Sequence, residues 1–254
     1  MAASENNPGE YVDFGFDRVP PDEKQRRVRG VFDSVAHRYD LMNDLMSAGL
    51  HRAWKRFALA RTGLRAGQSA LDVAAGSGDL SDGVARQVGP AGRVLVTDIN
   101  ASMLGLGRSR MIDAGHVANI HYLQANAEQL PVSGSAFDCV TIGFGLRNVT
   151  DKDTALAEMY RVLRPAGRLL VLEFSRPQFE LLDSAYEYYC THVLPRLGKL
   201  VVDDADSYRY LAESIRVHPD QETLKSMMAQ QGFERCEYYN LSGGIVSLHL
   251  GFRL

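Results

Sequence analysis

The pattern of apolar and polar positions changes near residue 67. From there onward, short apolar runs of strand length alternate with amphipathic stretches of helical period. The expected strands are 69–73, 93–98, 119–124, 137–143 and 167–174, and the expected helices between them are 79–88, 101–114 and 151–163. Such alternation is typical of an α/β fold, in which a parallel sheet carries helices on both faces. Ligands of these sheets bind at the carboxyl ends of the strands.

The chain before residue 67 has a helical pattern instead. Residues 1–22 are rich in Ser, Glu, Asn, Pro and Asp, which predicts a mobile arm. Residues 23–66 are expected to form a helical cap, because apolar side chains, among them Val28 and Tyr39, recur there at helical spacing. The α/β domain then covers residues 67–254.

The segment 175–219 interrupts the alternation after the fifth strand. It holds five of the eleven tyrosines and reads as helical. A segment this long at the ligand edge of a sheet is usually functional, and amphipathic aromatics suit an apolar tunnel, although an extra packing layer or a dimer face is the alternative. Residues 221–231 then predict the last helix, and 233–239 with 245–252 predict a terminal hairpin that brings the sheet to seven strands.

The turn after the first strand has a spacing that points to a ligand. Asp72 lies near the end of this strand, and Gly76 and Gly78 follow in the pattern D-x-A-x-G-x-G. Glycine lets backbone pass close to a ligand because it has no Cβ. A dinucleotide fingerprint would need a third glycine where Ser81 stands. The pattern matches the first motif of S-adenosylmethionine-dependent methyltransferases, although any tight strand-to-helix turn also uses glycine.

Other polar residues follow the neighbouring strands at the same edge. Asp98 closes the second strand, where a carboxylate can accept hydrogen bonds from two ribose hydroxyls. Asn126 and Ala127 follow the third strand and are expected beside the adenine edge. Gly143 ends the fourth strand, which should face the methionine part of the cofactor and the methyl acceptor.

Composition narrows the class of protein. The 254 residues are 45% apolar with a net charge of −3, enough for one large α/β domain. The three cysteines and seven histidines show no metal-ligand spacing, so we expect no metal and a reducing compartment, that of a cytoplasmic enzyme. No apolar run reaches the length of a membrane span, so any membrane contact is expected to be peripheral, on the inner face.

The segment 24–65 has a local excess of positive charge. It has ten Lys/Arg against three Asp/Glu, a local charge of +7. A solvated helical face explains this charge, and so does a patch that meets an anionic membrane surface, where each basic residue contributes about 1 kcal/mol. Nucleic acid is not expected, because the segment lacks interleaved aromatics and the isoelectric point is near 6.2.

Four further segments resemble one family. They are 31–44 (VFDSVAHRYDLMND), 51–56 (HRAWKR), 144–151 (FGLRNVTD) and 204–215 (DADSYRYLAESI). Together and in this order they are similar to the UbiE/MenG family, the C-methyltransferases of ubiquinone and menaquinone biosynthesis. The resemblance implies a Rossmann-like class I methyltransferase fold with a seven-stranded, mostly parallel sheet. It also implies S-adenosylmethionine as the methyl donor.

The resemblance assigns residues as well as a reaction. The implied acceptor is a ring carbon of a polyprenylated quinol, either demethylmenaquinol or 2-methoxy-6-polyprenyl-1,4-benzoquinol. The family's contacts to S-adenosylmethionine fall on Ser77, Asp98, Asn126 and Ala127, and on Gly143, where the family usually has a serine. A methyltransferase of another phenolic or lipid acceptor and a non-catalytic scaffold of a quinone-biosynthesis complex remain as alternatives. Homodimerisation, tail length and the choice of pathway stay open.

The chemistry of ring methylation suggests catalytic residues. A hydroquinone becomes nucleophilic at carbon when it loses a phenolic proton of pKa about 10, so the site must stabilise a phenolate. Arg147 is the leading candidate for this role and for orienting a water, because its turn follows the fourth strand; a structural ion pair is the alternative. Tyr39 is the second candidate, to hydrogen-bond a quinol oxygen, with core packing as its alternative.

Overall fold

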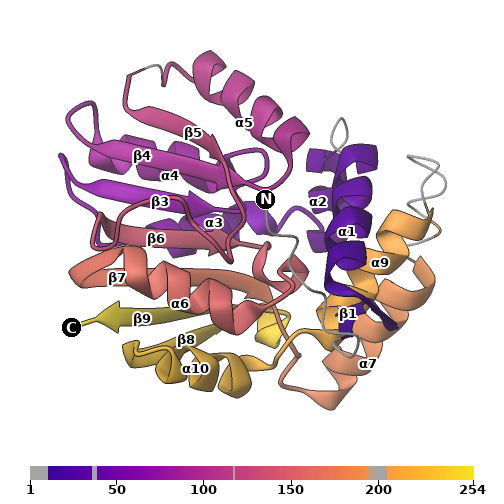
Figure 1. Ribbon diagram of the computed structural model, residues 1–254. Helices are drawn as coiled ribbons and strands as arrows, with labels where there is room; N and C mark the ends of the chain where they lie inside the picture. Colours follow the sequence, from indigo (N-terminus) through magenta and orange to yellow (C-terminus); the bar gives the residue numbers. More distant parts are fainter. Residues whose placement is uncertain (1–10, 36–38, 117, 194–195, 197–204) are drawn as a thin grey trace.

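The computed structural model describes residues 11–35, 39–116, 118–193, 196 and 205–254. A seven-stranded sheet runs through it in the order β5-β4-β3-β6-β7-β9-β8 (Figure 1). The strands are β3 (Ser69–Val73), β4 (Arg93–Asp98), β5 (Ile120–Gln124), β6 (Phe137–Gly143), β7 (Leu163–Phe174), β8 (Glu234–Leu241) and β9 (Val246–Arg253). The first five in spatial order are parallel, and β9 is antiparallel to both of its neighbours. The predicted fold class is confirmed.

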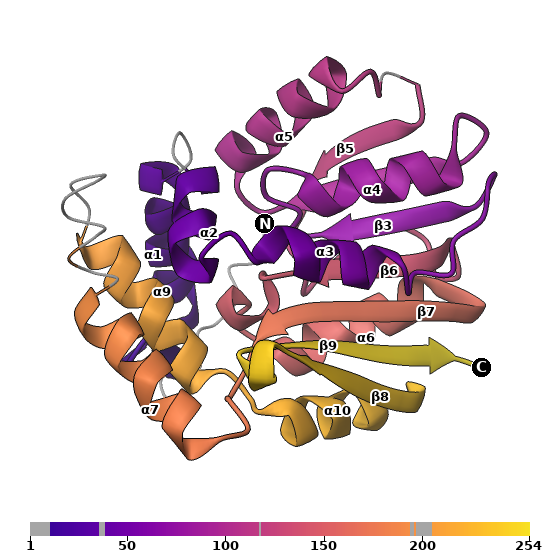
Figure 2. The ribbon, with the colours of Figure 1, turned by 180° about the vertical axis from the view of Figure 1, so that it is seen from behind.

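Helices cover both faces of this sheet. One face carries α3 (His51–Leu59), α4 (Asp79–Val88) and α5 (Ala101–Asp113), which lie in front in Figure 2. The other carries α6 (Lys152–Val162) and α10 (Gln221–Gln230), in front in Figure 1. Successive side chains of each strand alternate between the two faces. Ala70 therefore packs in the core under α3 and α4, whereas Leu71 packs in the core under α6 and α10.

A helical layer lies beyond the carboxyl ends of the parallel strands. It contains α1 (Pro21–Val35), α2 (Tyr39–Ser47), α7 (Glu180–Tyr188), a short π-helix (Tyr189–Val193) and α9 (Ala205–Val217). Figure 1 shows α1, α7 and α9 packed together on this side of the sheet. Within the expected cap, the structure separates α2 from α3, because Ala48 and Gly49 adopt positive φ angles of 47° and 77° that no helix continues through.

Part of the segment expected as an arm has a defined structure. Within residues 1–22, β1 (Val12–Phe14) and β2 (Asp17–Val19) form a small antiparallel hairpin. The ring of Phe14 stacks on Tyr210 of α9 with centroids 4.2 Å apart. Hydrophobic contact with a helix far away in the sequence therefore holds residues 12–19 in place, which the polar composition of the segment does not reveal.

Candidate functional site

The glycine turn after β3 has the backbone that its sequence predicts. Gly76 and Gly78 adopt φ angles of +56° and +82°, a region that side-chain-bearing residues rarely occupy. Gly78 is also the N-cap of α4. The turn ends where the first amides of α4 begin, so backbone donors are directed toward this edge of the sheet.

Asp98 reaches this turn from the end of the neighbouring strand. Its Oδ2 accepts a hydrogen bond from Gly76 N at 2.8 Å, and its Oδ1 accepts one from Asn100 N at 2.8 Å. Burial raises the pKa of Asp98, while these backbone hydrogen bonds act in the opposite direction. The carboxylate is thereby held in one orientation, and each oxygen keeps a lone pair for a further donor.

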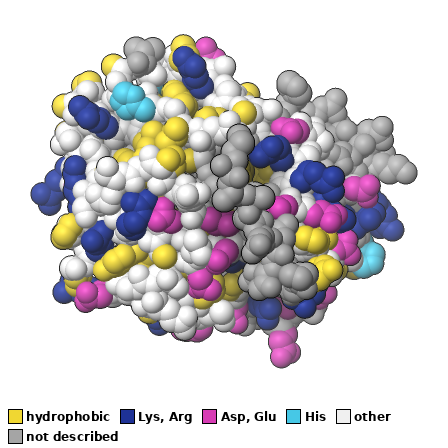
Figure 3. All heavy atoms as spheres, in the orientation of Figure 1, with side chains coloured by type: hydrophobic (Ala, Val, Ile, Leu, Met, Phe, Trp, Pro, Cys, Tyr) yellow, Lys and Arg dark blue, Asp and Glu magenta, His cyan; other side chains and the backbone are white. Residues whose placement is uncertain are grey.

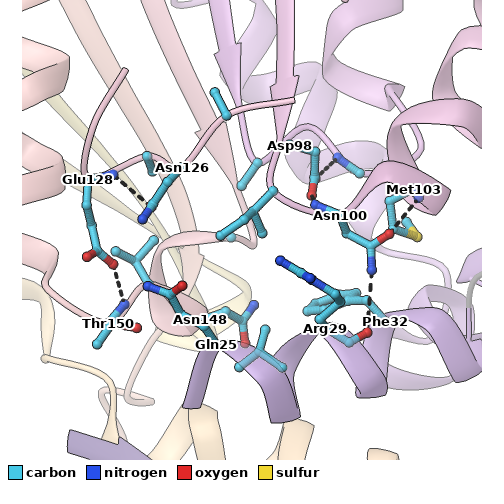
Figure 4. Close-up of a pocket in the computed structure, with 18 of the residues that line it drawn as sticks. Gln25, Arg29, Phe32, Asp98, Asn100, Met103, Asn126, Glu128, Asn148 and Thr150 are labelled. Carbon is cyan, nitrogen blue, oxygen red and sulfur yellow. Dashed lines mark hydrogen bonds between the residues drawn. The ribbon is translucent and has the colours of Figure 1, made fainter. Parts of the chain in front are cut away.

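A large pocket opens beside Asp98, with an empty volume of about 780 Å³ that includes space open to solvent. Gly76, Asp98, Asn126 and Ala127, four of the residues predicted from the sequence, line it together. Figure 4 shows Asp98 and Asn126 on opposite sides of the pocket. Asn126 Oδ1 accepts from Glu128 N at 3.0 Å, which fixes the turn after β5. The pocket therefore connects the ends of β3, β4 and β5.

Helix α1 forms the opposite wall of the pocket. Gln25, Val28, Arg29 and Phe32 line it from this helix, as Figure 4 shows for the three labelled ones. Sequence reasoning did not assign these residues to the site. They are three or four positions apart, so they lie on one face of a helix. This spacing could have identified them from the sequence, but only with the knowledge that α1 covers the edge of the sheet.

The turn after β6, where sequence reasoning placed Arg147, supplies a third wall, although its lining residues were not assigned from the sequence. Phe144, Gly145, Asn148, Val149 and Thr150 line the pocket. Phe144 adopts φ +58°, and its ring lies 4.9 Å from that of Phe174. Thr150 N donates to Glu128 Oε1 at 3.0 Å, so the turn after β6 is tied to the turn after β5.

Asp72 lies away from this pocket. It is 1% exposed, and its two carboxylate oxygens accept from Ser81 Oγ at 2.5 Å and Thr141 Oγ1 at 2.7 Å. Burial raises the pKa of Asp72 to about 6 despite these two hydroxyls. Asp72 thus joins β3, α4 and β6, and it lines a second, smaller cavity together with Ser77 and Gly143.

Arg147 is buried in an ion pair rather than exposed in the large pocket. Its Nη1 lies 2.7 Å from Glu173 Oε1 and donates to Phe144 O at 2.5 Å. Glu173 is fully buried and also accepts from Arg147 N at 3.2 Å. Arg147 Nε has no hydrogen-bond partner in the described part of the chain. The guanidinium therefore fixes the turn that carries Phe144 and keeps one donor free.

The other sequence expectations meet the structure only in part. Tyr39 is the first residue of α2, but its side chain lies outside what the structure describes. Among the described residues, no group of three His, Cys, Asp or Glu side chains is arranged to hold a metal ion. No described helix combines the length and the hydropathy that crossing a membrane requires.

Comparison with known proteins identifies the family. The model of the ubiE/COQ5 methyltransferase family matches residues 21–253. The chain belongs to this family. A relative in Marinomonas sp. (strain MWYL1), named ubiquinone/menaquinone biosynthesis C-methyltransferase UbiE, is 59% identical over 242 residues, which cover 95% of this chain and 96% of the relative. A relative of the same name in Vibrio cholerae is 57% identical over 253 residues, 100% of this chain and 97% of the relative.

Solved structures of other methyltransferases share the fold of this ubiE/COQ5 family member. A SAM-dependent methyltransferase from Aquifex aeolicus superposes with a TM-score of 0.58 at 15% identity, over 79% of this chain and 89% of that one. Phosphoethanolamine N-methyltransferase 2 from Haemonchus contortus also gives 0.58 at 15% identity, over 79% and 52%. The family membership makes the protein a methyltransferase, and the resemblance predicted from its sequence is confirmed.

Proposed function

We propose that this protein transfers a methyl group from S-adenosylmethionine to a ring carbon of a polyprenylated quinol. The acceptor is demethylmenaquinol, 2-methoxy-6-polyprenyl-1,4-benzoquinol, or both. The observation that carries the proposal is 57–59% identity, along nearly the whole chain, to relatives named for C-methylation in ubiquinone and menaquinone biosynthesis.

The residues of the large pocket fit S-adenosylmethionine. Asp98 is an oriented carboxylate with free lone pairs, suited to the two hydroxyls of a ribose. Ile99 and Ala127 line the pocket as apolar neighbours for an adenine ring, and Asn126 adds a polar edge. When bound, S-adenosylmethionine supplies an electrophilic methyl group on a positively charged sulfur.

The same site must favour the phenolate of the acceptor. Arg147 carries a permanent charge, and burial makes this charge act over a low dielectric. Its Nε is buried and has no hydrogen-bond partner among the described residues, so it is the donor that we assign to a phenolate oxygen or to a water. We therefore assign Arg147 the stabilisation of the anion and the orientation of a water. Tyr39 is retained as a hydrogen-bond donor to a quinol oxygen.

Contact with a membrane surface belongs to the same proposal. Lys24 and Lys55 of the basic segment point inward, whereas Arg26, Arg56 and Arg65 are exposed. On the face shown in Figure 3, Lys and Arg side chains are interspersed with Asp and Glu. Binding to anionic vesicles should therefore be weak and should decrease from low to high salt; binding that is independent of salt would exclude contact through these arginines.

A direct assay tests the reaction. The purified protein is incubated with radiolabelled S-adenosylmethionine and reduced demethylmenaquinone in detergent, with the benzoquinol precursor in parallel, and label is measured in the extracted quinone. We expect label in at least one acceptor, and none when the ring is kept oxidised. Confirmed S-adenosylmethionine binding without label in either acceptor would exclude the proposed reaction.

A further inference from the structure

The proposed reaction needs a base, and Arg147 does not supply one. A guanidinium stays protonated in proteins, so Arg147 can stabilise a phenolate but cannot accept its proton. The base must reach the phenolic hydroxyl directly or through one water. A neutral histidine is the side chain that most often takes this role near neutral pH. His51, the first residue of α3, has the features of such a base.

A carboxylate orients the ring of His51. Its Nε2 lies 3.0 Å from Asp44 Oδ1 of α2. The hydrogen bond from Arg52 lowers the pKa of Asp44, whose Oδ2 accepts from Arg52 Nη2 at 3.0 Å. An ionised carboxylate only accepts hydrogen bonds, so Nε2 of the neutral ring carries the hydrogen and Nδ1 presents a lone pair. Asp44 therefore fixes both the orientation and the tautomer of His51.

The basic nitrogen of this ring is buried and unoccupied. His51 is 5% exposed, and its Nδ1 has no hydrogen-bond partner among the described residues. Buried polar atoms in folded proteins nearly always have a partner, and an exception calls for a bound water or a role in function. Nδ1 is thus the atom of His51 that a water or a substrate hydroxyl can meet.

Helix α3 directs His51 toward the turn that carries Arg147. The helix begins next to α2, at the edge of the sheet where the parallel strands end (Figure 2). His51, Trp54 and Lys55 are three and four positions apart, so they share one face of α3. The ring of Phe144 lies 6.2 Å from that of Trp54 and 6.0 Å from Lys55 Nζ. Phe144 lines the large pocket, so this face of α3 is turned to the site.

The charges around His51 keep its ring neutral. Burial lowers the pKa of His51 below its ordinary value of 6.5, and the charges of Lys55 and Arg52 lower it further. The hydrogen bond and charge of Asp44 act in the opposite direction. Asp79, at the start of α4, also interacts with this ring. His51 is therefore a base rather than an acid at neutral pH.

We propose that His51, oriented by Asp44, is the base that accepts the phenolic proton of the methyl acceptor, directly or through one water. The O–H bond breaks toward oxygen, the ortho carbon bonds to the methyl group, and the bond from methyl to sulfur breaks toward sulfur. The methylated carbon then loses its hydrogen to solvent, while His51 returns its proton to the oxygen. One proton is released per methyl group transferred. This inference rests on the proposed function, because it concerns the same reaction.

The pH dependence of turnover tests this role. Without the base in His51→Gln, only an acceptor that is already ionised reacts. About one molecule in 1000 is ionised at pH 7 for a phenolic pKa near 10, so kcat/KM should be about 1000-fold below wild type. The ratio of variant to wild type should then rise about tenfold per pH unit up to about pH 9. Groups that titrate in both proteins cancel in this ratio.

His116→Gln is the matched control. His116 forms a similar pair, with Nε2 2.7 Å from Asp82 Oδ1 of α4, but it does not line the large pocket. Its kcat/KM should equal that of wild type at each pH. The Kd of His51→Gln for S-adenosylhomocysteine should stay within about twofold of wild type, which shows that the site is folded. Added imidazole should restore part of the turnover of His51→Ala.

Two results would overturn the inference. The first is wild-type turnover in His51→Gln, and the second is a loss that is the same at every pH, since His51 would then only link α2 to α3. If the His51 variants do not fold, Asp44→Asn provides the test: we expect kcat/KM to fall at least about tenfold, and an unchanged value would also overturn the inference. Absence of methyl transfer by the wild-type protein would instead contradict the proposed function.

Discussion

Asp72 and Asp98 lie at the carboxyl ends of neighbouring strands, as the last residue but one of β3 and the last residue of β4, and both are almost completely buried. Sequence reasoning places both beside a cofactor, Asp72 in the glycine motif and Asp98 at the ribose. The structure separates them by their partners, because hydroxyls of Ser81 and Thr141 close around Asp72, whereas only backbone amides hold Asp98. Those hydroxyls come from a helix and from another strand, so the local sequence around Asp72 does not reveal them.

The buried charge of Asp72 should make stability depend on pH. Its pKa is about 6 in the folded protein and about 4 in an unfolded chain. The folded state therefore holds the proton more tightly, and stability is lost as pH rises between these two values. At about 1.4 kcal/mol per pKa unit, the loss is roughly 3 kcal/mol.

Urea unfolding of wild type and Asp72→Asn measures this loss, because the variant lacks the titrating group. We expect the free energy of unfolding of wild type, relative to the variant, to decrease by roughly 3 kcal/mol between about pH 4 and pH 7. A difference that is constant over this range would show that folding does not raise the pKa of Asp72.

Variants of the buried ion pair between Arg147 and Glu173 distinguish a structural role of Arg147 from a catalytic one. Arg147→Gln leaves a fully buried carboxylate without its cation, which should cost about 3–5 kcal/mol of stability. Adding Glu173→Gln removes that charge and should restore most of the stability. Thermal or urea unfolding measures both effects.

Turnover should behave differently from stability in these variants. If Arg147 stabilises the phenolate, kcat stays low in the stable double variant, while the Kd for S-adenosylmethionine changes little. Glu173→Gln alone is the control that keeps the cation. Recovery of kcat together with stability in the double variant would leave Arg147 with a structural role only.

At the scale of elements, α1 covers the large pocket and is attached at both ends. Near its start, Lys24 Nζ donates to Val149 O at 3.0 Å. Near its end, Asp33 Oδ1 accepts from Asn100 Nδ2 at 2.9 Å. The two attachment points belong to loops on opposite sides of the pocket. Arg29 and Phe32 of α1 line the pocket, so we expect a ligand to enter and leave beside this helix.

Removing one attachment should speed ligand exchange. Asp33→Ala abolishes the bond to Asn100, and a hydrogen bond of about 0.5–1.5 kcal/mol predicts about two- to tenfold faster dissociation of S-adenosylhomocysteine. Amides of α1 should also exchange hydrogen faster. Asp33→Asn keeps an oxygen acceptor and should remain close to wild type. Unchanged dissociation in Asp33→Ala would mean that α1 does not limit ligand release.

Most element boundaries were predictable because the periods of strands and helices are local properties. Strands 69–73, 93–98 and 137–143 coincide with the structure. The hairpin of residues 12–19 was not predicted, because it depends on contacts such as the bond from Phe16 N to Glu213 Oε2, across 197 residues. The role of α1 as a wall of the site was missed for the same reason.

At the scale of the whole molecule, the sequence predicted the sheet, its ligand edge and the family. Motifs located Asp98, Asn126 and Ala127 at one pocket, since parallel strands bring their ends together. The division of the site into two cavities was not predictable. It depends on which side of the glycine turn each residue faces, as with Gly76 and Ser77, and on the packing of α3 against α4.

The expected cap, residues 23–66, shares its core with the sheet. Trp54, the single tryptophan, is 5% exposed and donates to Ser242 Oγ at 3.0 Å. Its ring lies 6.2 Å from Phe144 and from Phe174 at the end of β7. Separate unfolding of the cap would expose this whole cluster, so cap and sheet should unfold together.

Urea unfolding followed at once by Trp54 fluorescence and by far-ultraviolet circular dichroism tests this cooperativity. We expect the same midpoint from both probes, because one reports the cap and the other mainly the whole fold. S-adenosylhomocysteine at about 100 times its Kd should stabilise both transitions equally, by about 2.7 kcal/mol, since the ligand contacts both parts. A fluorescence transition at lower urea than the circular-dichroism transition would show that the cap is a unit that opens independently over the site. A ligand that shifts the fluorescence midpoint and leaves the circular-dichroism midpoint in place would show the same.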